Sequence, residues 1–226
     1  MKKAITINNV IGLFLLMAIS AVIGQNPTFD ESQVDLEAKK LLDATSSKLD
    51  AQSAIKVDFD LEMIVPGQEA DVQEGVLLQK GDNFLFDIES QMIVSNAKAV
   101  YVYMKDDNEI QINDPDFGED GSLLSPAQMM RLYETESFFY AITDVAGNLT
   151  KIEFKPEDEY SDYSKLRLSV DHNLKEIRKM EIFSKDGTRI NLKVKNLDLE
   201  PELTTESFSF DVNQFPGTYI EDLRID

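Results

Sequence analysis

Residues 55–65, with the sequence IKVDFDLEMIV, alternate apolar and charged side chains along most of their length. The side chains of a β-strand point to opposite faces in turn, so this stretch predicts a strand with one apolar and one charged face. The apolar face carries Val57, Phe59, Leu61 and Met63. A sheet built from such strands has to cover its apolar face or use that face to hold an apolar ligand.

Similar stretches follow along the chain, and turn-forming residues such as Gly81-Asp82-Asn83 and Lys185-Asp186-Gly187 separate them. Because the connections are short, we expect antiparallel pairing. Residues 105–121 are acidic and irregular, and no strand is predicted there. The further predicted strands are 72–80, 84–89, 92–95, 99–104, 141–145, 149–155, 166–170, 176–184, 189–197 and 207–211.

Two segments have helical spacing. Residues 30–50 place apolar side chains on one helical face, with Asp30 as the expected N-cap and Gln33 completing a capping box. A second helix is expected to start at Ser125-Pro126, with serine as the N-cap and proline at the first helical position. The apolar side chains of this second helix are Met129, Met130, Leu132 and Tyr133.

The number of strands sets the expected architecture. About eleven strands are too many for a comfortable open sheet, which tends to curl or close. We therefore predict a mainly β fold with helices (α+β), in which a curved antiparallel sheet forms an open half β-barrel. The helices would lie across the mouth of this barrel, and the second helix would act as an apolar lid.

The first residues are typical of a secretory signal peptide. Lys2 and Lys3 precede an apolar run over residues 10–23, which is shorter than the roughly 20 residues that a spanning helix needs. We expect residues 1–24 to be cleaved, which leaves a single domain over residues 25–226. The chain contains no cysteine, so it has no disulfide and no N-terminal cysteine for a lipid anchor.

Charge and motif content exclude several function classes. The formal net charge of −20 disfavours binding to nucleic acid or to an anionic membrane. The single histidine, His172, lies in a predicted surface turn, and the chain has no Gly-x-Ser-x-Gly motif. The acidic stretch 106–120 lacks the ligand spacing of an EF-hand. The sequence therefore predicts no catalytic residue, no metal site and no cofactor, and we do not expect an enzyme.

Several stretches, taken in order, resemble the LolA family of periplasmic outer-membrane lipoprotein carriers. Residues 72–77 look like the family's second strand, and residues 93–103, with the sequence IVSNAKAVYVY, resemble one of its hairpins. Residues 149–156 and 184–189 are similar to two later motifs of the family, a strand and a turn. Residues 208–217 resemble its closing F-x-F-x-x-P-x-G signature. The resemblance runs over nearly the whole chain after the signal peptide.

The resemblance implies an open β-barrel with a helical lid, whose apolar cavity holds the acyl chains of a lipoprotein without catalysis. It also implies a periplasmic location, an inner-membrane lipoprotein-releasing transporter as donor and an outer-membrane acceptor, and we expect a monomer. The family usually has an arginine and a proline between its second and third strands, and the arginine helps to control the lid. Lys80 stands there in this chain and is the candidate for lid control, although a lysine lacks the bidentate fork of an arginine side chain.

The candidate ligand-binding residues are the apolar side chains of the expected cavity and lid. Such residues also build ordinary protein cores, but the abundance of phenylalanine and methionine suits a ligand of variable shape. The candidates are Val57, Phe59, Leu61, Met63, Leu77, Phe84, Phe86, Ile88, Val94, Tyr101, Met129, Met130, Leu132, Tyr133 and Phe138.

Three hypotheses for the function follow. The first is a soluble periplasmic carrier that binds the acyl chains of lipoproteins and delivers them to the outer membrane. The second is a periplasmic sensor or interaction module with the same fold. The third is a carrier of another amphiphile, such as a pigment or a glycolipid.

Overall fold

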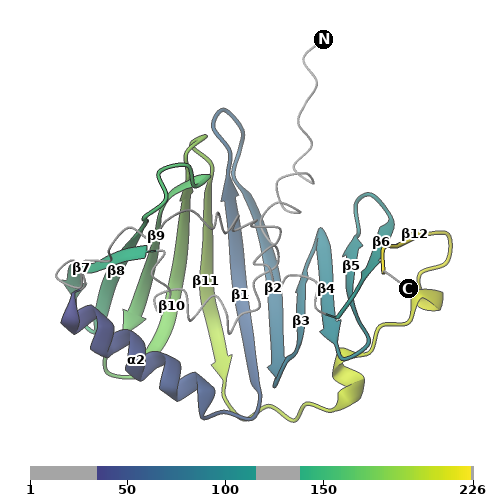
Figure 1. Cartoon of the computed structure of the whole chain (residues 1–226), viewed down its shortest axis with the longest axis horizontal. Helices are drawn as coiled ribbons and strands as arrows, with labels where there is room; N and C mark the ends of the chain where they lie inside the picture. Colours follow the sequence, from purple (N-terminus) through teal and green to yellow (C-terminus); the bar gives the residue numbers. More distant parts are fainter. Residues whose placement is uncertain (1–34, 116–137, 225–226) are drawn as a thin grey trace.

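The computed structural model describes residues 35–115 and 138–224, which form one continuous sheet of twelve strands (Figure 1). The strand order is β12-β6-β5-β4-β3-β2-β1-β11-β10-β9-β8-β7. The two end strands, β12 and β7, do not pair with each other, so the sheet remains open. The strands are β1 (Ile55–Ile64), β2 (Asp71–Lys80), β3 (Asn83–Ile88), β4 (Gln91–Asn96), β5 (Ala99–Met104), β6 (Glu109–Asn113), β7 (Phe138–Ala146), β8 (Leu149–Pro156), β9 (Tyr163–Asp171), β10 (Glu176–Ser184), β11 (Arg189–Asp198) and β12 (Tyr219–Asp222).

This sheet confirms the predicted fold class, and it adds two strands that the sequence pattern did not indicate. Strand β6 lies inside the acidic stretch that was expected to be irregular. Strand β12 pairs with β6 in parallel, from Tyr219 opposite Glu109 to Asp222 opposite Ile112. All other strand pairs are antiparallel, as predicted.

Residues 207–211 do not form the predicted strand. The 3-10 helix η3 (Thr205–Phe208) ends in this stretch, and a second one, η4 (Val212–Gln214), begins directly after it. Phe208 is buried, and the ring of Phe210 stacks on Tyr101 with 4.8 Å between the ring centroids. The alternating apolar residues of this stretch therefore pack against the sheet and do not extend it.

The helix α2 (Leu36–Asp50) begins later than expected, because Asp35 is its N-cap in place of Asp30. The Oδ1 atom of Asp35 accepts hydrogen bonds from the backbone N–H groups of Glu37 and Ala38, at 2.9 and 3.1 Å. Its Oδ2 atom accepts a third bond, at 3.0 Å, from the backbone N–H of Ile142 in β7. One carboxylate thus caps the helix and joins it to the sheet.

Helix α2 lies across the lower ends of the strands at the β7–β10 end of the sheet (Figure 1). Its buried residues include Ala38, Leu41 and Leu42, which belong to the same core cluster as the apolar side chains of the sheet. We call the face of the sheet that carries this cluster the inner face. The second predicted helix falls in residues 116–137, outside the described residues. Within 35–115 and 138–224, no helix is long and apolar enough to cross a membrane.

Candidate functional site

The inner face presents a continuous apolar surface across both halves of the sheet. Residues that lie opposite one another on paired strands share a face. Phe59 in β1 lies opposite Val194 in β11 on one side and opposite Gly75 in β2 on the other, so all three are on the inner face. The rings of Phe59 and Phe86 stack with 5.3 Å between their centroids. At the other end, Tyr140 of β7 and Phe154 of β8 pack with centroids 5.5 Å apart. The alternation that predicted each strand therefore builds one shared face.

Most of the candidate ligand-binding residues lie on this face as fully buried core. Each has at most 9% of its surface exposed, so its main contacts are with other side chains of the protein. Leu77 shares the face and is only partly buried. Met129, Met130, Leu132 and Tyr133 lie outside the described residues. The buried candidates are Val57, Phe59, Leu61, Met63, Phe84, Phe86, Ile88 and Phe138.

Other inner-face residues keep exposed surface, and sequence reasoning did not select them. They are partly buried apolar side chains that pack against the core, and their pairing places them on the inner face. Met180 lies opposite both Leu168 and Leu192, for example, and Leu192 lies opposite Leu61. Alternation within each strand separates its two faces, and pairing with a neighbouring strand of known orientation would have identified these residues as inner-face residues. With Leu77, the set is Val102, Ile142, Met180, Leu192 and Val194.

Val94 and Tyr101 do not share the inner face. Val94 lies opposite Leu85 and Tyr101, whereas its neighbour Ile93 lies opposite Phe86. Because residues opposite one another share a face, Val94 and Tyr101 point to the other face of the sheet, which we call the outer face. There, Tyr101 packs with Ile110, Ile112 and the C-terminal segment in a second apolar cluster.

Lys80, the residue assigned to lid control, also belongs to the outer side of β2. Gln79 lies opposite the inner-face residue Phe84 and therefore points to the inner face. Lys80 is the next residue along the strand, so its side chain points to the outer face. Its Nζ atom donates a hydrogen bond to the backbone carbonyl of Leu203 at 2.6 Å. The contact that Lys80 makes among the described residues is therefore with the C-terminal segment.

Most buried polar side chains of the described residues are paired. The Oε1 atom of Gln73 accepts from the backbone N–H and the hydroxyl of Ser90, at 3.0 and 2.9 Å. Asn113 Nδ2 and Gln91 Oε1 are buried without a hydrogen-bond partner. An unpaired buried polar group costs about 1–3 kcal/mol, so these two carboxamides call for an explanation.

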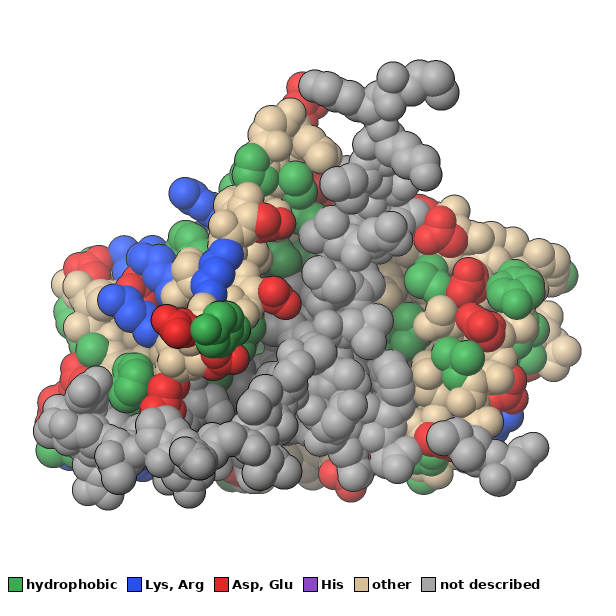
Figure 2. Space-filling model, turned by 45° about the horizontal axis from the view of Figure 1, so that its top comes forward, with side chains coloured by type: hydrophobic (Ala, Val, Ile, Leu, Met, Phe, Trp, Pro, Cys, Tyr) green, Lys and Arg blue, Asp and Glu red, His purple; other side chains and the backbone are tan. Residues whose placement is uncertain are grey.

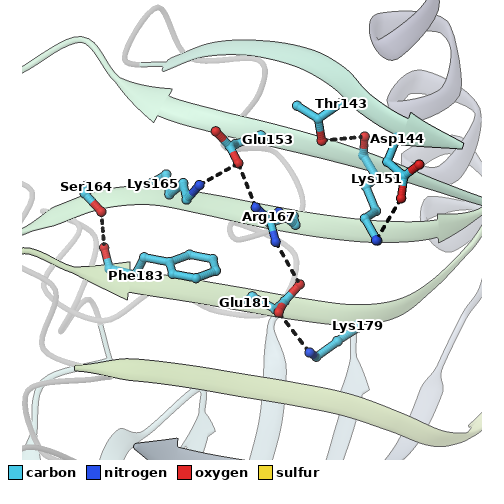
Figure 3. Close-up of polar contacts among 10 residues, drawn as sticks. All are labelled: Thr143, Asp144, Lys151, Glu153, Ser164, Lys165, Arg167, Lys179, Glu181 and Phe183. Carbon is cyan, nitrogen blue, oxygen red and sulfur yellow. Dashed lines mark hydrogen bonds and ion pairs between the residues drawn. The ribbon is translucent and has the colours of Figure 1, made fainter. Parts of the chain in front are cut away.

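The outer face over β8–β10 carries a ladder of charged side chains (Figure 3). Glu153 binds Lys165 at 2.9 Å and Arg167 at 3.0 Å, and Arg167 also lies 3.9 Å from Glu181. Burial raises the pKa of Glu153, but the hydrogen bonds from Lys165 and Arg167 outweigh it and hold that pKa below its usual value. Such opposite-charge pairs across strands stabilise the sheet and give this face a charged, solvated character.

Two features of the described residues bear on candidate chemistry, the acidic side chains and the single histidine. No group of three or more His, Cys, Asp or Glu side chains among them could hold a metal ion. His172 follows β9, and its Nδ1 atom lies 3.0 Å from the hydroxyl of Thr150. This contact joins the turn after β9 to the first residues of β8.

Comparison with solved structures finds matches at low sequence identity. An uncharacterized conserved protein from Thermus thermophilus matches with a TM-score of 0.52 and 11% identity, over 82% of this chain and 99% of that chain. A LolA superfamily protein from Nitrosomonas europaea gives 0.39 and 14%, over 77% and 98% of the two chains. The lipoprotein LppX from Mycobacterium tuberculosis gives 0.46 and 10%, over 75% and 98%. The similarity to the Thermus thermophilus protein indicates a shared fold and says nothing about the function of this chain.

Sequence comparison assigns the family. No curated protein sequence matches the chain. The family model described as outer membrane lipoprotein carrier protein LolA matches residues 53–211, a range that contains strands β1 to β11. The chain therefore belongs to the outer membrane lipoprotein carrier protein LolA family, a family with a lipoprotein-binding fold.

Proposed function

We propose that this protein is a periplasmic carrier that holds the acyl chains of lipoproteins on its inner face and delivers them to the outer membrane. The observation that carries the proposal is the inner face itself. Its apolar core cluster extends from β3 to β8, and it keeps partly buried apolar side chains such as Leu77 and Met180 at its surface. Membership of the LolA family adds the kind of ligand, and the proposed signal peptide over residues 1–24 adds the compartment.

The driving force for binding would be the removal of acyl chains from water. Each buried methylene group contributes about 0.8 kcal/mol, so part of one acyl chain is enough for micromolar affinity. Apolar contacts along the acyl chains have no preferred direction, so they discriminate little between chains of different length or shape. That suits a carrier of many cargoes, which receives them from a transporter in the inner membrane and releases them to an acceptor in the outer membrane.

Bound lipid provides the first test. The protein, expressed from its full coding sequence and purified without detergent, is extracted and analysed by mass spectrometry. The proposal predicts co-purified acylated molecules, and triacylated lipopeptide should displace a fluorescent fatty-acid probe from the protein. A glycolipid or a pigment in the extract would instead assign the inner face to another amphiphile. A protein that carries no acylated ligand and binds no probe would contradict the proposal.

A matched pair of variants locates the binding surface. Leu192 and Lys193 are neighbours in β11, but Leu192 lies opposite Leu61 on the inner face and Lys193 lies opposite Asp60 on the outer face. Leu192→Gln should weaken probe binding by roughly tenfold, because a polar amide replaces apolar surface that the ligand covers. Lys193→Gln should leave the affinity unchanged. Equal effects of the two variants would contradict binding on the inner face.

A further inference from the structure

Two buried carboxamides of the inner face lack hydrogen-bond partners, although other buried polar groups nearby are paired. Asn113 is 5% exposed and Gln91 is 3% exposed. Their atoms Asn113 Nδ2 and Gln91 Oε1 have no partner. By contrast, Gln73 bonds to both Asp71 and Ser90. A buried amide that remains unpaired in the free protein is a group that a ligand could satisfy.

The strand register places Asn113 beside a second polar group. Asn113 of β6 lies opposite Val100 of β5, and Val100 lies opposite Ser95 of β4. Ser95 in turn lies opposite Phe84, so all four side chains share the inner face. Ser95 is 8% exposed. Adjacent strands are about 4.8 Å apart, so Asn113 and Ser95 stand about 10 Å apart on either side of the smaller Val100.

We propose that Asn113 and Ser95 form a polar anchor that donates hydrogen bonds to the ester carbonyl groups of a diacyl lipid head. This inference rests on the proposed function and adds the chemistry of the cargo that the inner face selects. The amide N–H of Asn113 and the hydroxyl of Ser95 are both donors, whereas an ester carbonyl is an acceptor that donates nothing. Two donors on either side of Val100 suit a ligand with two neighbouring carbonyls, as in a diacylglyceryl group.

The surroundings of the anchor fit the rest of such a ligand. Val102 follows Val100 by two residues on the same face and is partly buried, and Phe86 lies opposite Ile93 next to it. Acyl chains that extend from the anchor along β4 and β5 therefore meet apolar side chains. The charged ladder of Figure 3 lies on the outer face at the other end of the sheet and offers no competing site here.

Gln91 supplies a matched control. It is the other unpaired carboxamide of the inner face, but it lies four residues from Ser95 along β4. At about 3.3 Å per residue this separation is roughly 13 Å, too far for contact with the same head group. Asn113→Leu and Gln91→Leu each remove one unpaired carboxamide, and the two side chains are similarly buried. Only Asn113→Leu should weaken binding of the ester carbonyl groups.

The experiment compares two fluorescent lipids of equal chain length, one a diester and the other a diether that lacks both carbonyl groups. The wild-type protein, expressed from its full coding sequence, should bind the diester more tightly than the diether. Asn113→Leu should weaken diester binding by three- to tenfold, leave diether binding unchanged and keep or raise the melting temperature. Ser95→Ala should shift the preference in the same direction, and Gln91→Leu should leave it intact.

The outcomes separate this inference from the proposed function. A wild-type protein that binds diester and diether equally well, or an Asn113→Leu variant that weakens both to the same extent, would overturn the anchor and leave the carrier function standing. A protein that binds neither lipid would overturn the carrier function together with the anchor. If Asn113→Leu fails to fold, Ser95→Ala decides between these outcomes.

Discussion

Single residues in this protein act through contacts that join neighbouring elements of the fold. Gly75 illustrates this, because a Cβ atom at this position would lie 2.4 Å from the Phe59 ring and 2.8 Å from Ile88 Cγ2. Only a residue without a side chain lets the Phe59 ring lie over β2. The sequence motif around Gly75 supports the family resemblance, but the reason for the glycine is a tertiary contact.

Gly75→Ala should lower the free energy of unfolding by about 1–3 kcal/mol, because the Phe59 ring has to move in a closely packed core. Urea denaturation measures the loss. In the double variant Gly75→Ala/Phe59→Leu, the smaller leucine leaves room for the added methyl group. The two substitutions should therefore cost less together than the sum of their separate effects, and strict additivity would contradict the proposed contact.

Asp35 is expected to link stability to pH. The hydrogen bond from Ile142 N–H is the largest cause that holds the pKa of Asp35 below its ordinary value, and the bonds from Ala38 and Glu37 add to it against the effect of burial. A lowered pKa means that the carboxylate stabilises the folded protein above the unfolded-state value of about 3.9. This contribution is lost as the pH falls through the folded-state pKa.

Asp35→Ala should therefore cost about 1–2 kcal/mol at neutral pH, since three backbone N–H groups lose their acceptor. The difference between wild type and variant should stay constant from about pH 7 to pH 5 and shrink below about pH 4. Urea unfolding at a series of pH values measures it. A difference that grows toward acid pH would show that Asp35 is not the stabilising carboxylate.

At the scale of elements, the C-terminal segment completes the sheet by packing on its outer face. Phe210 stacks between Tyr101 and Phe215, at centroid distances of 4.8 and 5.2 Å. Beyond these rings, the segment ends in β12, a four-residue strand that pairs only with β6. Because so short a strand has few ladder hydrogen bonds of its own, we expect the aromatic contacts that precede it to contribute strongly to its position.

Phe210→Ala should loosen β12 without unfolding the rest of the sheet. We expect amide hydrogen exchange of residues 219–222 to become at least tenfold faster, while exchange in β1 and β11 stays the same. Tyr160→Ala is the control, because Tyr160 is 84% exposed and lies far along the chain from this segment. Unchanged exchange in β12 of the Phe210→Ala variant would mean that strand pairing alone holds the segment.

At the scale of the whole molecule, charge is distributed unevenly, whereas the apolar core extends through both halves of the sheet. Basic side chains gather at the end of the molecule that contains β7–β10, although the net charge is −20 (Figure 2). The inner core cluster runs through both halves of the sheet, from Ile93 in β4 through Phe59 in β1 to Ile152 in β8. The two halves thus share one core, and their stability is expected to be coupled.

Ile93→Ala and Ile152→Ala test this coupling from opposite halves. Both side chains are at most 1% exposed, so each truncation should cost about 2–5 kcal/mol. Denaturation should remain a single transition, with the same midpoint by circular dichroism and by hydrogen exchange of the unmutated half. Separate transitions for the two halves would show that the sheet consists of two independent folding units.

The sequence by itself determined ten of the twelve strands and the kind of surface they build. Strict alternation in β1 predicted both of its faces, because every second residue was charged. Short turns predicted antiparallel pairing, and motifs in the right order along the chain predicted the LolA family. These features depend on residues close together in the chain, so local pattern was sufficient to find them.

Tertiary structure decided which face each apolar residue occupies and which residues keep exposed surface. In β4 and β5 both faces carry apolar residues, so nothing in the pattern distinguished Val94 and Tyr101 from Ile93 and Val102. The register with β3 assigned them to opposite faces. Pairing of β12 with β6 and the unpaired amide of Asn113 depend equally on contacts between distant segments. Period-two alternation separates the two faces of a strand, but only packing against its neighbours determines which of them is the inner one.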